Sequence, residues 1–248
     1  MAIRPRSRAH AALQLVRALL HLLAGLWTVY TRFGHLDPTQ RFVHVQAWSR
    51  DMLRILGIEL QLHGLPPQQG PLLLVSNHIS WLDITVLHAV CSCRFVSKAD
   101  VRHWPVIGRL ATACGTLYVE RESRRDAMSV VHHMAEALRN GDMGAVFPEG
   151  TTSNGDGLLP FHANLVQAAI SADAPVQPLA LRFTDADGVH STAPSYVGDD
   201  SLHGSVWRTV CAAPLVAHVW FGVSQQADGR DRRAWAHALQ QAVQRLRT

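Results

Sequence analysis

Cysteine is scarce in this chain, and its spacing carries no metal-binding signal. The four cysteines form no Cys-x-x-Cys pair, and no secretory cleavage pattern is evident; they are Cys91, Cys93, Cys114 and Cys211. Paired cysteines are typical of zinc sites, and disulfide frameworks are typical of secreted domains. We therefore expect buried, reduced thiols and no structural metal.

The chain also lacks the Gly-x-Ser-x-Gly sequence in which a hydrolase serine lies on a sharp turn between a strand and a helix. Internal repeats and low-complexity tracts are missing as well. The length of 248 residues and the hydrophobic content of 48% instead suit one large α/β domain with a substantial core.

Acidic residues are almost absent from the first fifty positions, where seven arginines stand against the single acid Asp37. The arginines are Arg4, Arg6, Arg8, Arg17, Arg32, Arg41 and Arg50. A basic arm of this kind can bind nucleic acid, but no nucleic-acid module or aromatic stacking motif accompanies it. We therefore expect a lipid partner and no nucleic acid.

Residues 11–30 form an apolar segment within this basic arm. Twenty helical residues reach about 30 Å, the thickness of the hydrocarbon layer of a bilayer. Arg17 would cost roughly 2.5–3.5 kcal/mol near the middle of a spanning helix, so we favour a helix lying on the cytoplasmic face of the membrane. Trp27 and Tyr30 would then lie near the headgroups, and the arginines would meet anionic lipid. A single span and a soluble core helix are the alternatives.

The rest of the chain alternates between strand and helix patterns. A second amphipathic helix is expected from Thr39 to Leu56, ended by Gly57. Strands are expected at 58–63, 71–76, 94–98, 116–120, 143–147, 176–182 and 215–223. Helices are expected at 106–113, 126–139, 163–172 and 230–247, with an irregular stretch at 184–204.

This alternation predicts an α/β fold with a mostly parallel mixed sheet flanked by helices, in which ligands bind beyond the carboxyl ends of the strands. The alternating strand 58–63 is expected at an edge, and the continuously apolar strand 71–76 in the centre. We expect two parts, a membrane-associating helical segment at 1–57 and the α/β domain at 58–248.

A histidine and an aspartate at a strand exit are the first candidates for chemistry. His78 and Asp83 follow the apolar run 72–75. Residues five apart on a helix lie about 140° apart, so the two can meet only if His78 is in the turn and Asp83 on the next helix. An aspartate in contact with an imidazole fixes its tautomer and stabilises its protonated form, as a general base requires.

A second strand exit has the same design. The apolar strand 143–147 runs into the polar turn 148–153, and Lys98 also stands directly after a predicted strand. Because the carboxyl ends of parallel strands meet at one edge of the sheet, we expect His78, Lys98 and Glu149 to lie at that edge.

Taken together, these segments resemble the signature blocks of the glycerolipid acyltransferases, the 1-acyl-glycerol-3-phosphate acyltransferase family. The family motifs N-H-x-x-x-x-D and F-P-E-G-T-x-S stand here at 77–83 and 147–153. Between them, Lys98, a Pro-x-x-Gly turn at 105–108 and Arg121 resemble the family's second block. Residues 174–179 resemble its V-P-I-x-P strand, so the resemblance runs from about 58 to 223.

The resemblance implies acyl transfer from a thioester to a hydroxyl, without a protein nucleophile. It implies that His78 is the general base, that Asp83 orients it and that Asn77 supports the turn. It also implies acceptor contacts, which we assign to Lys98, Arg121, Glu149, Gly150, Thr151, Thr152 and Ser153.

Three structural readings of these residues stay open. His78 could be a helix-capping or core residue, and 149–153 an ordinary strand-to-loop turn. Lys98 and Arg121 could be surface charges paired with Asp100 and Glu122.

Two positions depart from the family pattern and leave the acceptor head group open. Thr152 and His162 stand where the family often has arginine and lysine. We expect a membrane-associated O-acyltransferase of lipid biosynthesis that uses an acyl-coenzyme A or acyl-carrier-protein thioester as co-substrate and needs no cofactor. The first acceptor to consider is 1-acyl-glycerol-3-phosphate, which would give phosphatidic acid. The alternatives are another lyso-lipid such as one with an amino-acid head group, a thioesterase or lysolipase, and a non-catalytic lipid-surface module.

Overall fold

The structure is a computed structural model and describes residues 6–120, 124–212 and 214–247. Its strands are β1 (Ile58–His63), β2 (Leu72–Ser76), β3 (Arg94–Lys98), β4 (Leu117–Val119), β5 (Met143–Val146), β6 (Val176–Asp185) and β7 (Leu215–Phe221). Its α-helices are α1 (Arg8–Arg32), α2 (Pro38–Leu56), α3 (Leu82–His88), α4 (Ile107–Ala113), α5 (Arg124–Arg139), α6 (Val166–Ala172), α7 (Leu202–Cys211) and α8 (Arg232–Leu246).

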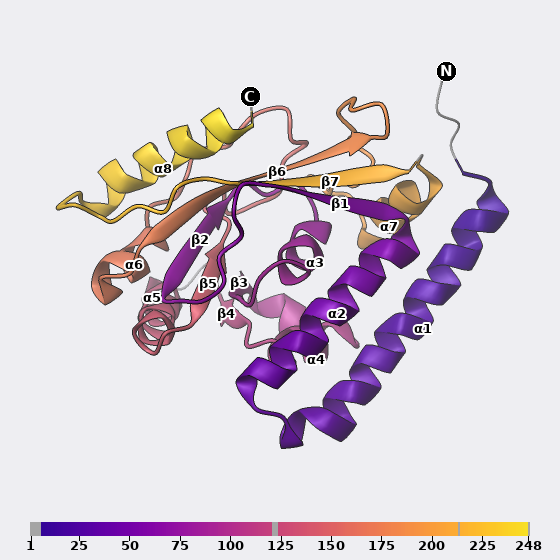
Figure 1. The fold of residues 1–248 in the computed structure, drawn as a ribbon, viewed down its shortest axis with the longest axis horizontal. Coiled ribbons are helices and arrows are strands. Elements are labelled where there is room, and N and C mark those ends of the chain that lie inside the picture. The colour runs from indigo at the N-terminus through magenta and orange to yellow at the C-terminus, as the bar shows by residue number, and fades with distance from the viewer. Residues whose placement is uncertain (1–5, 121–123, 213, 248) are drawn as a thin grey trace.

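The strands form one seven-stranded sheet in the order β1-β7-β6-β2-β5-β3-β4, with helices on both sides (Figure 1). The β6–β7 pair is antiparallel, and the other neighbouring strands are parallel. The predicted fold class, a mostly parallel mixed sheet flanked by helices, is confirmed.

Strand β2 lies in the middle of the sheet and is buried along its whole length. Leu72 and Leu74 face a core shared with α1, α2 and α3. Leu73 and Val75 face the opposite core, which includes side chains of α5, α6 and α8. Side chains alternate along a strand, so a strand covered on both faces needs a continuous apolar sequence. The predicted central and edge positions of 71–76 and 58–63 are both confirmed.

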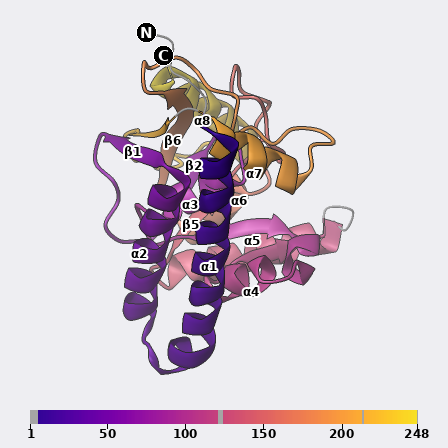
Figure 2. The ribbon, with the colours of Figure 1, turned by 90° about the vertical axis from the view of Figure 1, so that its right-hand side faces the viewer.

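Helices α1 and α2 form an antiparallel hairpin at one side of the molecule (Figure 2). Asp37 begins α2 by accepting the N–H of Gln40, whose side chain accepts the N–H of Asp37 in return. The guanidinium of Arg6 donates to the carbonyls of Leu56 and Gly57, both at 3.0 Å. The segment that leads into α1 is therefore hydrogen-bonded to the end of α2. Arg6, one arginine of the basic arm, thus has a structural role.

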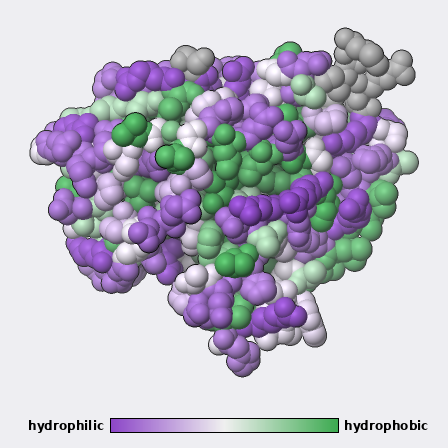
Figure 3. All heavy atoms as spheres, in the orientation of Figure 1, coloured by the Kyte–Doolittle hydropathy of each residue, from purple (hydrophilic) through white to green (hydrophobic). Residues whose placement is uncertain are grey.

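The outer face of α1 is apolar and exposed. Its exposed large apolar residues are Leu13, Val16, Leu19, Leu20, Leu23, Trp27 and Tyr30. They contribute to the green margin over α1 in the space-filling view (Figure 3). In the described residues, Arg8–His35 is the one helical segment long and apolar enough to be a candidate membrane span. Only 6% of its most apolar 18-residue stretch is buried. A soluble core helix would be mostly buried, so that alternative is wrong, and the exposed helix is consistent with membrane association.

Two elements differ from their predicted form. The stretch 184–204 was expected to be irregular, but β6 continues to Asp185 and α7 begins at Leu202. Helix α7 contains weak helix formers, and its polar residues Ser205 and Thr209 are buried against the carbonyls of 193–195. Tertiary hydrogen bonds, which a local sequence pattern does not indicate, therefore hold this helix.

Candidate active site

Three neighbouring parallel strands bring the predicted polar residues to one edge of the sheet. In the register, Val75 of β2 lies beside Val146 of β5, and Ala145 of β5 lies beside Phe95 of β3. His78 comes two residues after the end of β2 and Glu149 three residues after the end of β5. Lys98 is the last residue of β3. The carboxyl ends of β2, β5 and β3 thus carry His78, Glu149 and Lys98 toward the same side.

His78 and Asp83 are in direct contact. The Nδ1 atom of His78 lies 2.7 Å from Oδ2 of Asp83, which is in the first turn of α3. The same carboxylate oxygen accepts the backbone N–H groups of Ile79 at 2.7 Å and Ser80 at 2.9 Å. The Asp83 side chain is fully buried. Three donors on one oxygen fix the position of the carboxylate against the imidazole.

This contact determines which ring nitrogen of His78 can react. Because Nδ1–H donates to Asp83, the neutral imidazole carries its lone pair on Nε2. The ring stacks on Phe147, with centroids 4.0 Å apart and planes 9° apart, and the side chain remains 19% exposed. One face and one edge of the imidazole are therefore held by the protein, and Nε2 is left for a substrate proton.

Glu149 holds the backbone of the turn that carries His78. Its Oε1 accepts the N–H of His78 at 2.9 Å, and its Oε2 accepts the N–H of Leu159 at 3.0 Å. The side chain is only 3% exposed. Burial raises the pKa of Glu149, while the two backbone N–H groups and the charges of His78 and Arg247 partly offset that effect. Its predicted role in acceptor binding stays a prediction.

Asn77 joins β2 to β6 beside the turn. Its Nδ2 donates to the carbonyl of Leu181 at 3.0 Å, and its Oδ1 accepts the N–H of Leu181 at 2.7 Å. Both bonds are buried. The amide thus extends the sheet contact by one further pair of hydrogen bonds at the point where the chain leaves β2.

The turn 150–153 packs directly on the turn that carries His78. The N–H of Ser153 donates to the carbonyl of His78 at 2.9 Å, and the hydroxyl of Thr152 donates to the carbonyl of Tyr196. Gly150 has φ +69°, a left-handed conformation that glycine adopts without strain. Thr151 is exposed. The turn 150–153 therefore lies beside His78, and Thr151 is its most accessible residue.

Of the two predicted cations, only Lys98 lies in the described part of the chain. Lys98 is exposed at the end of β3, and within the described residues its ammonium makes no hydrogen bond or ion pair. The alternative pairing with Asp100 is therefore not observed. Arg121 and its alternative partner Glu122 lie outside the described residues.

Metal ligands do not gather around this site. Among residues 6–120, 124–212 and 214–247, no group of three or more His, Cys, Asp or Glu side chains could hold a metal ion. Cys91 and Cys93 are buried thiols, whereas Cys114 and Cys211 are only half-buried, contrary to prediction.

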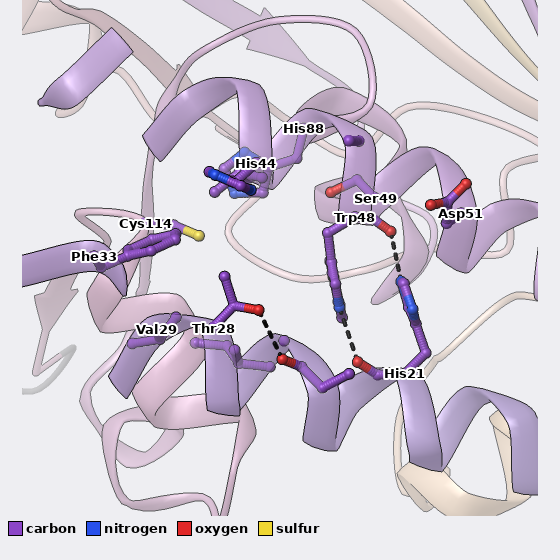
Figure 4. A pocket seen from close by; sticks show the side chains of 15 residues that line it. His21, Thr28, Val29, Phe33, His44, Trp48, Ser49, Asp51, His88 and Cys114 are labelled. Atoms are coloured by element: carbon purple, nitrogen blue, oxygen red, sulfur yellow. Dashed lines mark hydrogen bonds between the residues drawn. The ribbon is translucent and has the colours of Figure 1, made fainter. Parts of the chain in front are cut away.

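A cavity of about 280 Å³ lies between α1, α2 and α4 (Figure 4). Its wall is mostly apolar, but Nδ1 of His88 and Oγ of Ser49 are buried there without a partner in the described structure. Burial lowers the pKa of His88 to about 4. The sequence did not indicate this cavity, because it forms only where distant helices pack together.

Stacked rings connect the cavity wall with His78. His88 packs edge-on against Phe95, with ring centroids 4.9 Å apart. Phe95 stacks on Phe147 at 5.8 Å, and Phe147 stacks on His78. Two phenylalanine rings therefore lie between the cavity wall and His78, and the sequence did not indicate their part in the site.

Fold and site together define an α/β protein in which a buried aspartate holds a partly exposed histidine at the sheet edge, and comparison with known proteins gives its family. The acyltransferase family model matches residues 59–182. A 1-acyl-sn-glycerol-3-phosphate acyltransferase of Neisseria meningitidis serogroup B is 37% identical over 234 residues, which cover 92% of this chain and 91% of the relative. This chain belongs to the acyltransferase family, as the resemblance implied, and it is an enzyme of lipid biosynthesis.

Two further relatives extend the comparison. A lyso-ornithine lipid O-acyltransferase of Pseudomonas aeruginosa is 37% identical over 196 residues, covering 79% of this chain and 75% of that protein. The crystal structure of the 1-acyl-sn-glycerophosphate acyltransferase PlsC from Thermotoga maritima has a TM-score of 0.68 at 18% identity, covering 94% of this chain and 95% of that one. The solved structure thus supports the fold, and the relatives carry two different acceptors in their names.

Proposed function

We propose that this acyltransferase moves a fatty acyl group from an acyl-coenzyme A or acyl-carrier-protein thioester to the free hydroxyl of a lyso-lipid, with 1-acyl-glycerol-3-phosphate as the first candidate. The observation that carries the proposal is the 2.7 Å contact between Nδ1 of His78 and Oδ2 of Asp83. It leaves Nε2 as the basic atom beside a sheet edge where an acceptor can bind.

The proposed reaction uses this geometry. Nε2 of His78 takes the proton of the acceptor hydroxyl as its oxygen attacks the carbonyl carbon of the thioester. The tetrahedral intermediate collapses, the carbon–sulfur bond breaks, and the thiolate leaves. The imidazolium, stabilised by Asp83, returns its proton to the thiolate. No atom of the protein becomes acylated, and His78 ends neutral, as it began.

Two acceptors remain candidates, and a different observation supports each. Similarity to the Neisseria enzyme over almost the whole of both chains supports 1-acyl-glycerol-3-phosphate. The second candidate, a lyso-ornithine lipid, is supported by Thr152, whose hydroxyl binds the carbonyl of Tyr196, and by His162, since neither position supplies a permanent cation for a phosphate. Lys98 and Arg121 are the cations that would bind a phosphate head group in the first case.

We propose further that α1 lies on the cytoplasmic face of the membrane as a peripheral anchor. Its exposed apolar face supports insertion among acyl chains, and the exposed arginines Arg8, Arg17 and Arg32 support attraction to anionic lipid. A lipid acceptor would then diffuse along the surface to which the enzyme is bound.

The test is product analysis with a radiolabelled acyl thioester and the purified full chain. Lyso-lipids with glycerol phosphate and ornithine head groups are offered separately at matched acyl chain length, with His78→Ala as the inactive control. Label in the diacyl lipid supports the proposal, and the preferred head group distinguishes the two acceptors. Label released as free fatty acid in the presence of every acceptor would instead indicate a thioesterase or lysolipase. No turnover, with binding to lipid retained, would indicate a non-catalytic module.

A further inference from the structure

Tyr196 is hydrogen-bonded to both turns of the site. Its N–H donates to the carbonyl of Ile79 at 3.2 Å, in the turn that carries His78. Its carbonyl accepts the hydroxyl hydrogen of Thr152, in the turn 150–153. The backbone of one residue therefore links the turn of the proposed base with the turn predicted to bind the acceptor.

Pro194 adds a second contact to the turn of His78. Its carbonyl accepts the hydroxyl hydrogen of Ser80 at 2.6 Å, and both residues are buried. The N–H of Ser80 in turn donates to Oδ2 of Asp83 at 2.9 Å. The segment 194–196 therefore contacts a residue that itself holds the carboxylate of Asp83.

Helix α7 holds segment 194–196 through two side chains that are three positions apart and so lie on one face of the helix. Nη2 of Arg208 donates to the carbonyl of Ser195 at 2.7 Å. The hydroxyl of Ser205 lies 3.3 and 3.2 Å from the carbonyl oxygens of Pro194 and Ser195. Arg208 supplies the charged contact between the helix and this segment.

Asp200 fixes the orientation of the Arg208 guanidinium. Its carboxylate accepts hydrogen bonds from Nη1 at 3.2 Å and from Nη2 at 2.7 Å. Bonds to one carboxylate and one carbonyl together define the plane of the guanidinium. The side chains of Arg208 and Asp200 are 43% and 33% exposed, so water screens the ion pair and it contributes little to the free energy of unfolding. Its loss should therefore release segment 194–196 and leave the fold intact.

We propose that Arg208 is a positioning residue for the active site: by holding segment 194–196, it sets the alignment of the turn 150–153 with His78. The inference rests on the proposed function, in which His78 takes the proton of an acceptor bound beside it. Thr152 stands where the family often has arginine. In this chain its hydroxyl is bonded to the segment that Arg208 holds.

Release of segment 194–196 would change the path over which the proton moves. The N–H of Ser153 would still donate to the carbonyl of His78, at 2.9 Å in the structure, so the two turns would stay in contact while their alignment relaxes. An acceptor held by the turn 150–153 would then present its hydroxyl out of line with Nε2. Because a misplacement of about 1 Å can cost about a hundredfold in rate, kcat should fall more than KM rises.

The experiment compares Arg208→Gln with the matched control Arg94→Gln in the full-length protein. Arg94 is also 43% exposed and also contacts an aspartate at 2.7 Å, Asp142. It is the first residue of β3, at the opposite end of that strand from the site. If Arg208→Gln does not fold, Arg208→Lys repeats the test, because lysine keeps the charge but lacks the forked guanidinium.

Three measurements are made on each variant. Thermal melting verifies folding, and hydrogen exchange by mass spectrometry follows the peptides that contain Tyr196. Steady-state kinetics give kcat and KM with the detergent-dispersed acceptor that the lyso-lipid panel selects, either 1-acyl-glycerol-3-phosphate or the lyso-ornithine lipid.

A double variant tests whether Arg208 acts through the turn 150–153. Thr152→Val removes the hydroxyl that bonds to Tyr196 and keeps a side chain of similar shape. Combining it with Arg208→Gln should lose little more activity than the larger single loss, because both changes break the same connection. Combining it with Arg94→Gln should give the activity of Thr152→Val alone.

The expected result is faster hydrogen exchange at Tyr196 in Arg208→Gln. Its kcat should fall roughly ten- to a hundredfold, with a smaller change in KM and a nearly unchanged melting temperature. Arg94→Gln should match the unmodified protein in exchange at Tyr196 and in kcat.

Three outcomes would overturn the inference: unchanged exchange at Tyr196 in Arg208→Gln, faster exchange with unchanged kcat, or additive losses in the double variant with Thr152→Val. Hydrogen exchange needs no turnover, so it tests the hold of Arg208 on segment 194–196 independently of the acceptor. Failure of the proposed function is recognised separately, when the unmodified chain acylates no lyso-lipid in the panel.

Discussion

Oδ2 of Asp83 accepts Nδ1–H of His78 and also the N–H of Ile79. The pair of His78 and Asp83 is therefore built within one short segment, between the end of β2 and the first turn of α3. Because backbone N–H groups already hold the carboxylate, His78 is oriented before any substrate arrives, and the two side chains should act as a unit.

Replacing either member of the pair should nearly abolish acyl transfer. We expect His78→Ala and Asp83→Asn each to reduce kcat by about 10²–10⁴, because general-base catalysis is lost in the first variant and the reactive tautomer in the second. The double variant should lose little more activity than either single variant, because the two residues act together and one substitution already removes their joint effect. Initial rates with a radiolabelled thioester measure both effects.

The control for this pair is His132→Ala, an exposed histidine of α5, which should keep full activity. Folding of each variant is verified by thermal melting, because Asp83 is buried. Additive losses in the double variant would contradict the pair acting as a unit, and a folded His78→Ala with normal turnover would contradict the mechanism.

Lys98 should contribute to the binding of a phosphate head group. Replacing Lys98 by Gln should raise KM for 1-acyl-glycerol-3-phosphate more than it lowers kcat, because a contact made equally in the ground and transition states affects KM. A charge-assisted contact of about 1.5–3 kcal/mol corresponds to a rise of roughly ten- to a hundredfold. Lys98→Arg should retain most of the affinity. Steady-state kinetics with matched phosphate-headed and phosphate-free acceptors make the test, and equal KM values for the two in the unmodified enzyme would exclude phosphate recognition.

The features that the sequence predicted well are those that depend on neighbours along the chain. The apolar run 72–75 indicated the central strand, because a strand buried on both faces needs it. The five-residue spacing allowed contact between His78 and Asp83 only across a turn into a helix, and the structure has that arrangement. In both cases the local backbone geometry allows few alternative structures.

What the sequence did not indicate depends on distant packing. Helix α7 has its polar residue Ser205 bonded to carbonyls of 194 and 195, and no local pattern contains those bonds. The sequence predicts Phe147 only as the end of a strand, whereas in the structure its ring stacks on His78. Arg247 lies 92 positions from Gly155 in the sequence, and only the packing of α8 brings its guanidinium to that carbonyl.

Protonation of His88 should destabilise the protein at acidic pH. Burial lowers the pKa of His88 from 6.5 to about 4, so between these values the unfolded chain binds a proton that the folded protein does not. His88 therefore has no effect on the free energy of unfolding above pH 6.5. As the pH falls from 6.5 toward 4, it lowers the free energy of unfolding progressively, by about 3 kcal/mol in total. Urea unfolding between pH 7.5 and 4 measures it.

Replacing His88 by Leu should remove this part of the pH dependence while leaving the fold intact, because the neighbouring cavity wall is largely apolar. The exposed histidine His103 provides the control, and His103→Gln should keep the slope of the unmodified protein. If the slope of His88→Leu equals that of the unmodified protein, His88 is not the group that titrates.

The apolar face of α1 should anchor the enzyme to anionic membranes. Deleting the helix is a poor test, because Arg6 and Gln14 hold the carbonyls at the end of α2. Point changes are cleaner: Leu20→Gln with Trp27→Gln removes exposed apolar surface without touching the core. Each full side-chain burial contributes about 1.5–3 kcal/mol, so co-sedimentation with anionic vesicles should weaken at least tenfold.

The matched control is the pair Leu65→Gln and Val223→Gln, which removes two highly exposed apolar residues outside α1 and should leave binding unchanged. Binding of the unmodified protein should fall as salt rises, because attraction between arginines and anionic lipid is screened within about 8 Å at physiological ionic strength. It should not vanish, because the apolar face stays inserted. The α1 variant should retain turnover of a detergent-dispersed acceptor, since His78 and Asp83 lie outside the hairpin. Undiminished sedimentation of the α1 variant would mean that another surface binds the membrane.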